Sequence, residues 1–160
     1  KDSFKNPKSI LFRMRDELWL QERFNKVWET LFYDVERKNN VLVKFKGRWK
    51  NKFGHIRLLK DKSSEIVINS LFKHEKVPEF IIDLTLAHEL VHYGHGFNSP
   101  LESKHKHPHK GNIVNKELAS RGFGEMIRRE REFVKKEWPL LFKELHPNYK
   151  RKRVRLFRFF

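Results

Sequence analysis

The segment from Pro78 to Tyr93 constrains the fold more than any other, because it combines an apolar helix with metal-binding side chains. Its apolar residues fall on nearly every side of the expected helix, which is typical of a helix in a protein core. Residues 88–92 of this segment read H-E-x-x-H. A buried histidine or glutamate loses its hydration, which is costly unless the side chain finds a polar partner. The chain must therefore fold around a polar site on a buried helix.

This pattern predicts a metal site. His88 and His92 lie one helical turn apart, so both rings share one face and can present nitrogen atoms to one ion. Glu89 lies on the neighbouring edge, where its carboxylate can take a proton from a metal-bound water. The alternative is a chance occurrence, with both histidines solvated or satisfied within the core. The burial of the helix and the further histidines downstream favour the metal.

A catalytic zinc ion needs a third protein ligand and keeps one position open for water. His95 lies two turns after His88, but a glycine between them is expected to end the helix. His109 follows Pro108 and precedes Gly111 and the next helix, so its backbone is the best fixed among the loop histidines. The remaining candidates are two further loop histidines and one helical carboxylate: His105, His107 and Glu117.

The composition limits the class of protein. At 160 residues, with 38% hydrophobic residues, 15 Phe and 4 Trp, the chain can form one folded domain with a substantial core. With 0 Cys, disulfides are excluded and every metal ligand must be a histidine or a carboxylate. No apolar run reaches about 18 residues, so no membrane-spanning helix is expected. The first residues lack the apolar core of a signal peptide, which predicts a cytoplasmic protein.

The hydrophobic periodicity predicts the elements before the central helix. Apolar residues at helical spacing indicate a helix over residues 16–35, with its first residue, Asp16, as N-cap. Three short β-favouring runs follow, at residues 41–45, 55–59 and 65–69, and their close spacing favours a small, mostly antiparallel sheet. The third strand is expected at the sheet edge, where it could pair with an extended peptide.

The same reasoning predicts the elements after the central helix. A second long helical pattern runs from Asn112 to about Trp138, with glycines that can interrupt it, and a short last helix covers residues 140–145. The expected fold class is α+β. The domain is expected to span residues 16–145, between a basic arm at 1–15 and a basic, aromatic tail at 146–160.

The motif and the order of the expected elements resemble the SprT-like domain, the protease core of Spartan-type proteins. That family combines a helix, a short sheet, an H-E-x-x-H helix and a later histidine that precedes another helix. The resemblance extends roughly from residue 16 to residue 135. The segments that carry it are Val41–Phe45, Gly54–Arg57, Ile66–Asn69, Val77–His92 and Pro108–Gly111. The resemblance implies a zincin-like fold in which the small sheet packs on the H-E-x-x-H helix.

The resemblance also implies the composition of the site. His88, His92 and His109 would bind Zn2+, and Glu89 would act as general base. The chain departs from the family pattern at Lys110, which separates His109 from the following glycine. It also has no cysteine for the zinc ribbon that often follows the domain.

The function implied by the resemblance is a zinc-dependent endopeptidase that acts on DNA-associated or DNA-crosslinked proteins, with DNA as activator. Three alternatives stay open: a nucleic-acid-binding module with a structural zinc, a zinc hydrolase acting on another substrate, and a glutamate-type zincin with Glu117 as third ligand. Tyr93, His95 and Arg121 are candidates for oxyanion support, although a structural role is the favoured interpretation for each. We expect a monomer, associated with the nucleoid or, in a eukaryote, nuclear.

The net charge of +16 independently predicts binding to a polyanion. The alternative is a lysine-rich surface of the thermophile type, which the absence of Cys fits but the many Asn residues do not. In the tail, cations interleave with aromatic side chains, a pattern that can hold phosphates and stack on bases. A solvated tail is an equally good interpretation. The candidate nucleic-acid-binding residues are Lys150, Arg151, Lys152, Arg153, Arg155 and Arg158.

Overall fold

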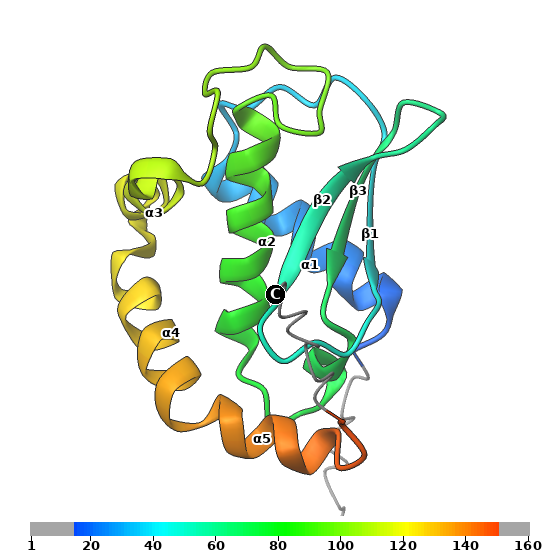
Figure 1. Ribbon diagram of the computed structural model, residues 1–160. Coiled ribbons are helices and arrows are strands. Elements are labelled where there is room, and N and C mark those ends of the chain that lie inside the picture. The colour runs from blue at the N-terminus through cyan, green and yellow to red at the C-terminus, as the bar shows by residue number, and fades with distance from the viewer. Residues whose placement is uncertain (1–14, 151–160) are drawn as a thin grey trace, which may run out of the picture.

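The structure, a computed structural model, describes residues 15–150 and has the expected α+β class (Figure 1). The N-terminal arm up to residue 14 and the tail cations from Arg151 to Arg158 lie outside the described residues. The strands are β1 (Val41–Phe45), β2 (Gly54–Leu58) and β3 (Ser64–Ile68). The helices are α1 (Glu17–Leu31), α2 (Glu79–Gly94), α3 (Ile113–Leu118), α4 (Gly124–Lys136) and α5 (Trp138–Leu145). Within this range, no helix is both long enough and apolar enough to cross a membrane.

The strands form a mixed sheet in the order β1-β3-β2. β1 pairs with β3 in parallel, with Val41 opposite Ser64, whereas β2 pairs with β3 antiparallel, with Gly54 opposite Ile68. The expectation of a mostly antiparallel sheet is therefore wrong, because one of the two pairings is parallel. The expectation of β3 at the edge is also wrong. β3 is the central strand, both of its edges are paired, and it cannot accept a peptide by strand addition.

The connection between β1 and β2 explains this topology. Residues 46–53 do not form a tight hairpin but cross the end of β3. Gly47 turns the chain with φ 79°, and a Cβ there would lie 2.1 Å from the Trp49 ring. The Asn69 side chain then holds the crossing segment, donating to the carbonyls of Trp49 at 2.7 Å and Lys52 at 3.0 Å. β2 therefore lies on the far side of β3 from β1.

β3 carries the buried layer of the sheet, and all of its residues are buried. The apolar run from Ile66 to Ile68 buries both faces of the strand, which is typical of a central strand rather than an edge. Glu65, 4% exposed, pairs across the sheet with Lys44 of β1 and, at 2.6 Å, with Arg57 of β2. One carboxylate therefore links all three strands.

α1 begins as the sequence predicts and ends earlier. Asp16 caps it, because its carboxylate accepts a hydrogen bond from the Trp19 amide at 2.7 Å. The helix stops at Leu31, short of the expected residue 35. Arg23 ties α1 to the first turns of α2, with Asp83 at 2.8 Å and Glu79 at 2.8 Å. The buried face of α1 consists of Trp19, Leu20, Phe24, Val27 and Trp28.

α2 lies at the centre of the molecule, between the sheet on one side and the curved run of α3, α4 and α5 on the other (Figure 1). Its approach to β2 is close at Gly54, where a Cβ would lie 2.7 Å from Thr85 Cγ2. The second long helical pattern is interrupted where the sequence predicts. Gly122 has φ 94° in the π-helical turn Ala119–Phe123, and this turn separates α3 from α4. α5 is fixed to the crossing segment by the Trp138 indole, which donates to the Lys50 carbonyl at 2.7 Å.

Candidate metal centre and cleft

The last turns of α2 present the H-E-x-x-H side chains to one place. The helix is buried on most sides, so Glu89 and His92 are only 5% and 2% exposed, while His88 is half-buried. The one-turn spacing aligns the rings of His88 and His92, and their Nε2 atoms lie 3.2 Å apart. The predicted sharing of one helix face is therefore confirmed for this histidine pair.

His109 joins the pair from the loop before α3. Its ring centroid lies 4.6 Å from that of His92. One ligand atom from each of His88, His92 and His109 can be chosen so that all lie within 4.8 Å of one another. Phe97 packs beside His92 at 5.3 Å and His109 at 6.0 Å between ring centroids. Within residues 15–150, this is the one cluster of three histidine or acidic residues with a geometry suited to a metal ion.

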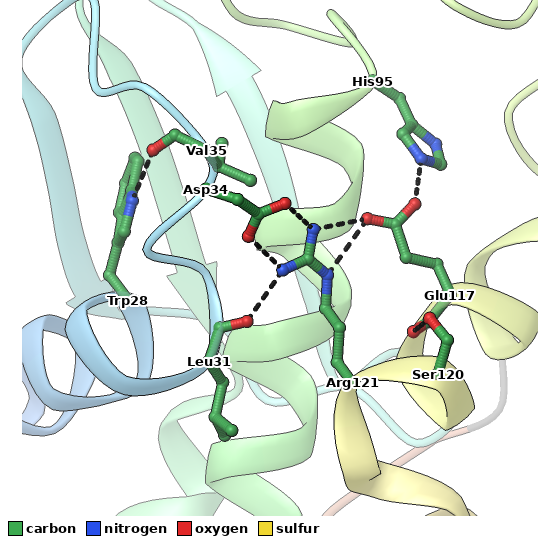
Figure 2. Close-up of polar contacts among 8 residues, drawn as sticks. All are labelled: Trp28, Leu31, Asp34, Val35, His95, Glu117, Ser120 and Arg121. Atoms are coloured by element: carbon green, nitrogen blue, oxygen red, sulfur yellow. Dashed lines mark hydrogen bonds and ion pairs between the residues drawn. The ribbon is translucent and has the colours of Figure 1, made fainter.

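The other third-ligand candidates lie elsewhere. Glu117 contacts His95 through one carboxylate oxygen and Arg121 through the other, at 3.0 Å (Figure 2). His105 packs against His95 with ring centroids 4.7 Å apart, and His107 is exposed. Among the described residues, none of these four candidates belongs to the histidine cluster.

The contacts of Glu117 form part of a network that joins three elements (Figure 2). Arg121 donates to Asp34 at 2.6 and 2.8 Å and to the Leu31 carbonyl at 2.7 Å. The end of α1, the end of α2 and the turn after α3 are therefore connected. Tyr93 also has a structural role, because its hydroxyl donates to Asn39 at 2.8 Å. The three candidates for oxyanion support thus all contact structural partners.

Burial and neighbouring charges set the ionisation of the α2 side chains. Burial, with a smaller effect of His109, lowers the pKa of His88 to about 4. Burial and the nearby histidines lower the pKa of His92 to about 3. Both rings are therefore neutral near neutral pH, which is the form that binds a metal. Burial raises the pKa of Glu89 to about 8, against the charge of Lys52 and a backbone hydrogen bond at Ile56. A divalent cation beside Glu89 would favour its ionised form.

Three imidazoles are a donor set that zinc accepts, and the spacing of the His88–His92 pair matches zinc geometry. Zinc–nitrogen bonds of about 2.0–2.1 Å in tetrahedral geometry place two nitrogen ligands about 3.3–3.4 Å apart. The observed Nε2 separation between His88 and His92 is 3.2 Å. The Nδ1 atom of His92 is buried and has no hydrogen-bond partner in the part of the chain that the structure describes. Nε2 is therefore the nitrogen of this ring that faces a polar neighbour.

His88 and Glu89 also face a cleft of about 600 Å³. The crossing segment lines it through Lys50 and Lys52, β2 lines it through Gly54, and α4 and α5 contribute further lining residues. The cleft can hold several side chains of a polymer beside the H-E-x-x-H residues. The remaining lining residues are Asn51, Phe53, Leu84, Thr85, Asn115, Leu118, Glu130, Val134, Trp138 and Pro139.

The other cleft residues were not predicted from the sequence, although their spacing contains a signal. Thr85 lies one turn before Glu89, so it shares the face of the catalytic candidate. Glu130, Val134 and Trp138 recur at one-turn spacing, which places them along one side of a helical segment. This pattern allows the inference that the three residues face the same way. It does not show that they lie near α2, because that depends on the turn at residues 119–123.

Comparison with known protein families, curated proteins and solved structures finds no match for the chain.

Proposed function

We propose that this chain is a zinc-dependent endopeptidase with a SprT-like, zincin-like domain. The observation that carries the proposal is the meeting of His88, His92 and His109 beside a buried Glu89 on the wall of a large cleft. The three imidazoles are the zinc ligands, and the cleft holds the peptide. The resemblance to SprT-like domains supports the same arrangement.

The chemistry follows from the placement of Glu89. When bound, zinc supplies Lewis acidity that activates a water molecule and polarises the peptide carbonyl. Glu89 accepts the proton of the attacking water on a carboxylate oxygen and then delivers it to the nitrogen of the leaving amine. The backbone hydrogen bond at Ile56 orients this carboxylate, and the charge of Lys52 favours its ionised form.

The number of donors supports a catalytic rather than a structural zinc. A structural zinc site is normally closed by four protein ligands, whereas a catalytic site keeps one position open. The cluster at His88 contains three histidines among residues 15–150. A structural site also needs no adjacent general base, and Glu89 occupies that position.

We further propose that the substrate proteins are associated with DNA. Support comes from the net charge of +16 and from the acid-free tail at residues 146–160, in which Lys150 is the one lysine or arginine that the structure describes. Lys150 is exposed. A salt-titrated DNA-binding assay tests this part, because phosphate neutralisation predicts a steep loss of affinity with salt. Affinity that does not depend on salt would contradict it.

The proposal is tested by Glu89→Gln. We expect this variant to retain zinc, measured by elemental analysis, and to lose at least about 100-fold in the rate of casein or histone cleavage, because its proton acceptor is gone. Glu125→Gln is a matched control, since Glu125 is exposed and outside the cleft, and it should cleave normally. The assays are run with and without DNA. Unchanged turnover in Glu89→Gln, or failure of the wild type to bind zinc, would overturn the proposal.

A further inference from the structure

The cleft beside Glu89 contains a carboxylate that the proposed chemistry does not use. Glu130 lies on α4 and lines the cleft, where it is half-buried. Among residues 15–150, its side chain has no hydrogen-bond or ion-pair partner. Burial is the main influence on it and raises its pKa, opposed by the charge of Arg131. Glu130 is thus a partly desolvated acid that no described cation pairs with.

This lack of a partner matters because Glu130 is half-buried, whereas glutamates such as Glu102 and Glu132 are exposed to water. Lys and Arg number 36 against 20 Asp and Glu, so cations are abundant. Two exposed glutamates of α4 and α5 have such cations as partners, since Glu125 pairs with Arg128 and Glu144 pairs with Lys76. A half-buried carboxylate loses part of its hydration and gains more from a cation than an exposed one does. A cation that enters the cleft would supply what the fold does not.

The walls around Glu130 determine the shape of the group that fits. Val134 follows it by one turn on the same helix, and Leu84 and Leu118 line the same cleft. These side chains can pack along an apolar stem, while Glu130 can accept hydrogen bonds from a charged end. Lysine and arginine combine these properties, since an aliphatic stem carries their charge. An aliphatic side chain would leave Glu130 unpaired, and an acidic one would be repelled.

The two lysines that also line the cleft do not reverse this preference. Lys50 and Lys52 are exposed, so solvent screens their charges and their long side chains can turn away. Lys52 lies over the Trp49 ring at 4.8 Å, and its charge acts on Glu89. Neither of these two described lysines forms an ion pair with Glu130. The half-buried carboxylate of Glu130 therefore favours a basic side chain over a neutral or acidic one in the cleft.

We propose that Glu130 is a specificity-determining residue that selects a lysine or arginine side chain of the peptide substrate next to the site of cleavage. This inference rests on the proposed endopeptidase function and adds a substrate class to it. A basic preference also suits proteins associated with nucleic acid, because their surfaces are rich in lysine and arginine.

Binding, rather than cleavage, provides the test. The full-length Glu89→Gln variant is titrated with fluorescein-labelled alanine-based peptides that carry a single central Lys, Gln or Glu, and anisotropy is measured. We expect the Lys peptide to bind about tenfold more tightly than the Gln peptide, the size expected of one charge-assisted hydrogen bond, and the Glu peptide to bind most weakly. Adding Glu130→Gln should reduce the Lys-to-Gln ratio to about twofold or less.

Two further variants make the result specific. Glu132→Gln removes the same charge from an exposed position on the same helix, outside the cleft, and should leave the ratio unchanged. Glu130→Lys should reverse the order in favour of the Glu peptide. Circular dichroism checks that each variant is folded, and Glu130→Gln keeps the shape of the original side chain.

The inference is overturned if no peptide binds, if the Lys peptide has no advantage, or if Glu130→Gln and Glu132→Gln reduce the ratio equally. These outcomes are independent of the endopeptidase proposal, because binding requires no turnover. A Lys preference that depends on Glu130, in a protein that cleaves no peptide, would overturn the endopeptidase proposal and leave Glu130 as a residue that binds basic peptides. Cleavage by the wild type without such a preference would overturn only the role of Glu130.

Discussion

His109 reaches the α2 histidines because the loop that carries it is held by packing between rings. His92 and Phe97 flank its imidazole, and Gly96 turns the chain just after α2 with φ 75°. A Cβ at Gly96 would lie 2.3 Å from the Glu102 carbonyl oxygen, so this turn requires glycine. The position of the third histidine therefore depends on contacts between segments rather than on spacing along one helix.

This arrangement predicts different outcomes for the rival third ligands. His109→Ala should lower the affinity for zinc by more than about 100-fold, because loss of a ligand exceeds the 10–100-fold effect of losing an outer-shell partner. His107→Ala removes an exposed ring outside the cluster and should bind zinc normally. Competition with a chromophoric chelator measures both affinities. Normal zinc binding by His109→Ala would exclude it as a ligand.

Glu117→Gln provides the second comparison for this prediction. Glu117 contacts His95 and Arg121, so its loss should leave the zinc affinity unchanged and destabilise the fold by about 1–3 kcal/mol, through unpaired buried groups. Urea denaturation measures the loss. A variant with unchanged stability and weakened zinc binding would instead support the glutamate-type site.

Single residues also show what could be predicted from the sequence. The His88–His92 pair could be predicted because residues one turn apart share a helix face. The choice of His109 depended on the family resemblance, since the residues alone left several candidates open. The engagement of Glu117 with His95 could not be predicted, because those residues meet only after α3 has folded back along the end of α2.

At the scale of elements, the ion pairs of Glu65 hold the sheet together. Burial opposes the ionisation of this carboxyl, but hydrogen bonds from Lys44 and Arg57 outweigh it and lower its pKa below the usual value. A group with a lowered folded-state pKa stabilises the fold above its unfolded pKa of about 4.3. This stability is lost as the pH falls through the folded pKa.

Glu65→Gln should therefore destabilise the protein at neutral pH by about 1–3 kcal/mol, below the cost of breaking a fully buried pair because both cations are partly exposed. The difference in free energy of unfolding between this variant and the wild type should shrink as the pH falls below about 4. Urea denaturation across this range measures it. The control is Glu125→Gln, which breaks an exposed pair with Arg128 and should change the midpoint little. A difference that does not depend on pH would contradict the role of the charge.

The contact between β2 and α2 gives a prediction about packing. In Gly54→Ala, the new Cβ would lie 2.7 Å from Thr85 Cγ2 and 2.9 Å from the Val67 carbonyl oxygen, so β2 must shift. We expect a loss of about 1–3 kcal/mol in the free energy of unfolding, measured by urea denaturation. Thr85→Ser removes the nearer contact and should restore part of the loss.

Gly124→Ala is the matched control for this substitution. Gly124 has helical backbone angles, and a Cβ there would meet no heavy atom within 4 Å, so alanine should be neutral or stabilise by up to about 1 kcal/mol. Equal effects of alanine at Gly54 and Gly124 would show that the close approach of β2 to α2 is not limiting.

The elements themselves could largely be predicted, but their pairing could not. The strand runs, the cap at Asp16 and the break near Gly122 all follow from local chemistry. The parallel pairing of β1 with β3 depends on the path of residues 46–53 across the end of β3, which is held by the distant Asn69 side chain. Short spacing between strands indicates hairpins only where the connection is a tight turn.

At the scale of the whole molecule, the net charge of +16 is the property that the fold leaves unexplained. Ion pairs such as those of Glu65 and Arg23 neutralise few of the cations. A charge of this size is expected to favour binding to polyanions such as nucleic acid, and the tail sequence contributes part of that charge. Two questions can therefore be separated: whether DNA binds, and whether the tail contributes more than its share of charge.

The tail prediction compares two variants with the same loss of charge. The first replaces by Gln the five tail cations outside the described residues, Arg151, Lys152, Arg153, Arg155 and Arg158. The second replaces by Gln five exposed lysines of the domain, Lys60, Lys116, Lys135, Lys136 and Lys143. If every tail cation contacts a phosphate, the slope of log affinity against log salt should fall by about 3.5 to 4.5 in the first variant, since each contact contributes about 0.7–0.9. In the second variant the slope should change much less, because those lysines are scattered over several elements.

Fluorescence anisotropy with labelled single- and double-stranded DNA over a range of salt concentrations measures both slopes. Equal slopes in the two variants would show that DNA binding depends on net charge alone and that the tail cations have no special role in it.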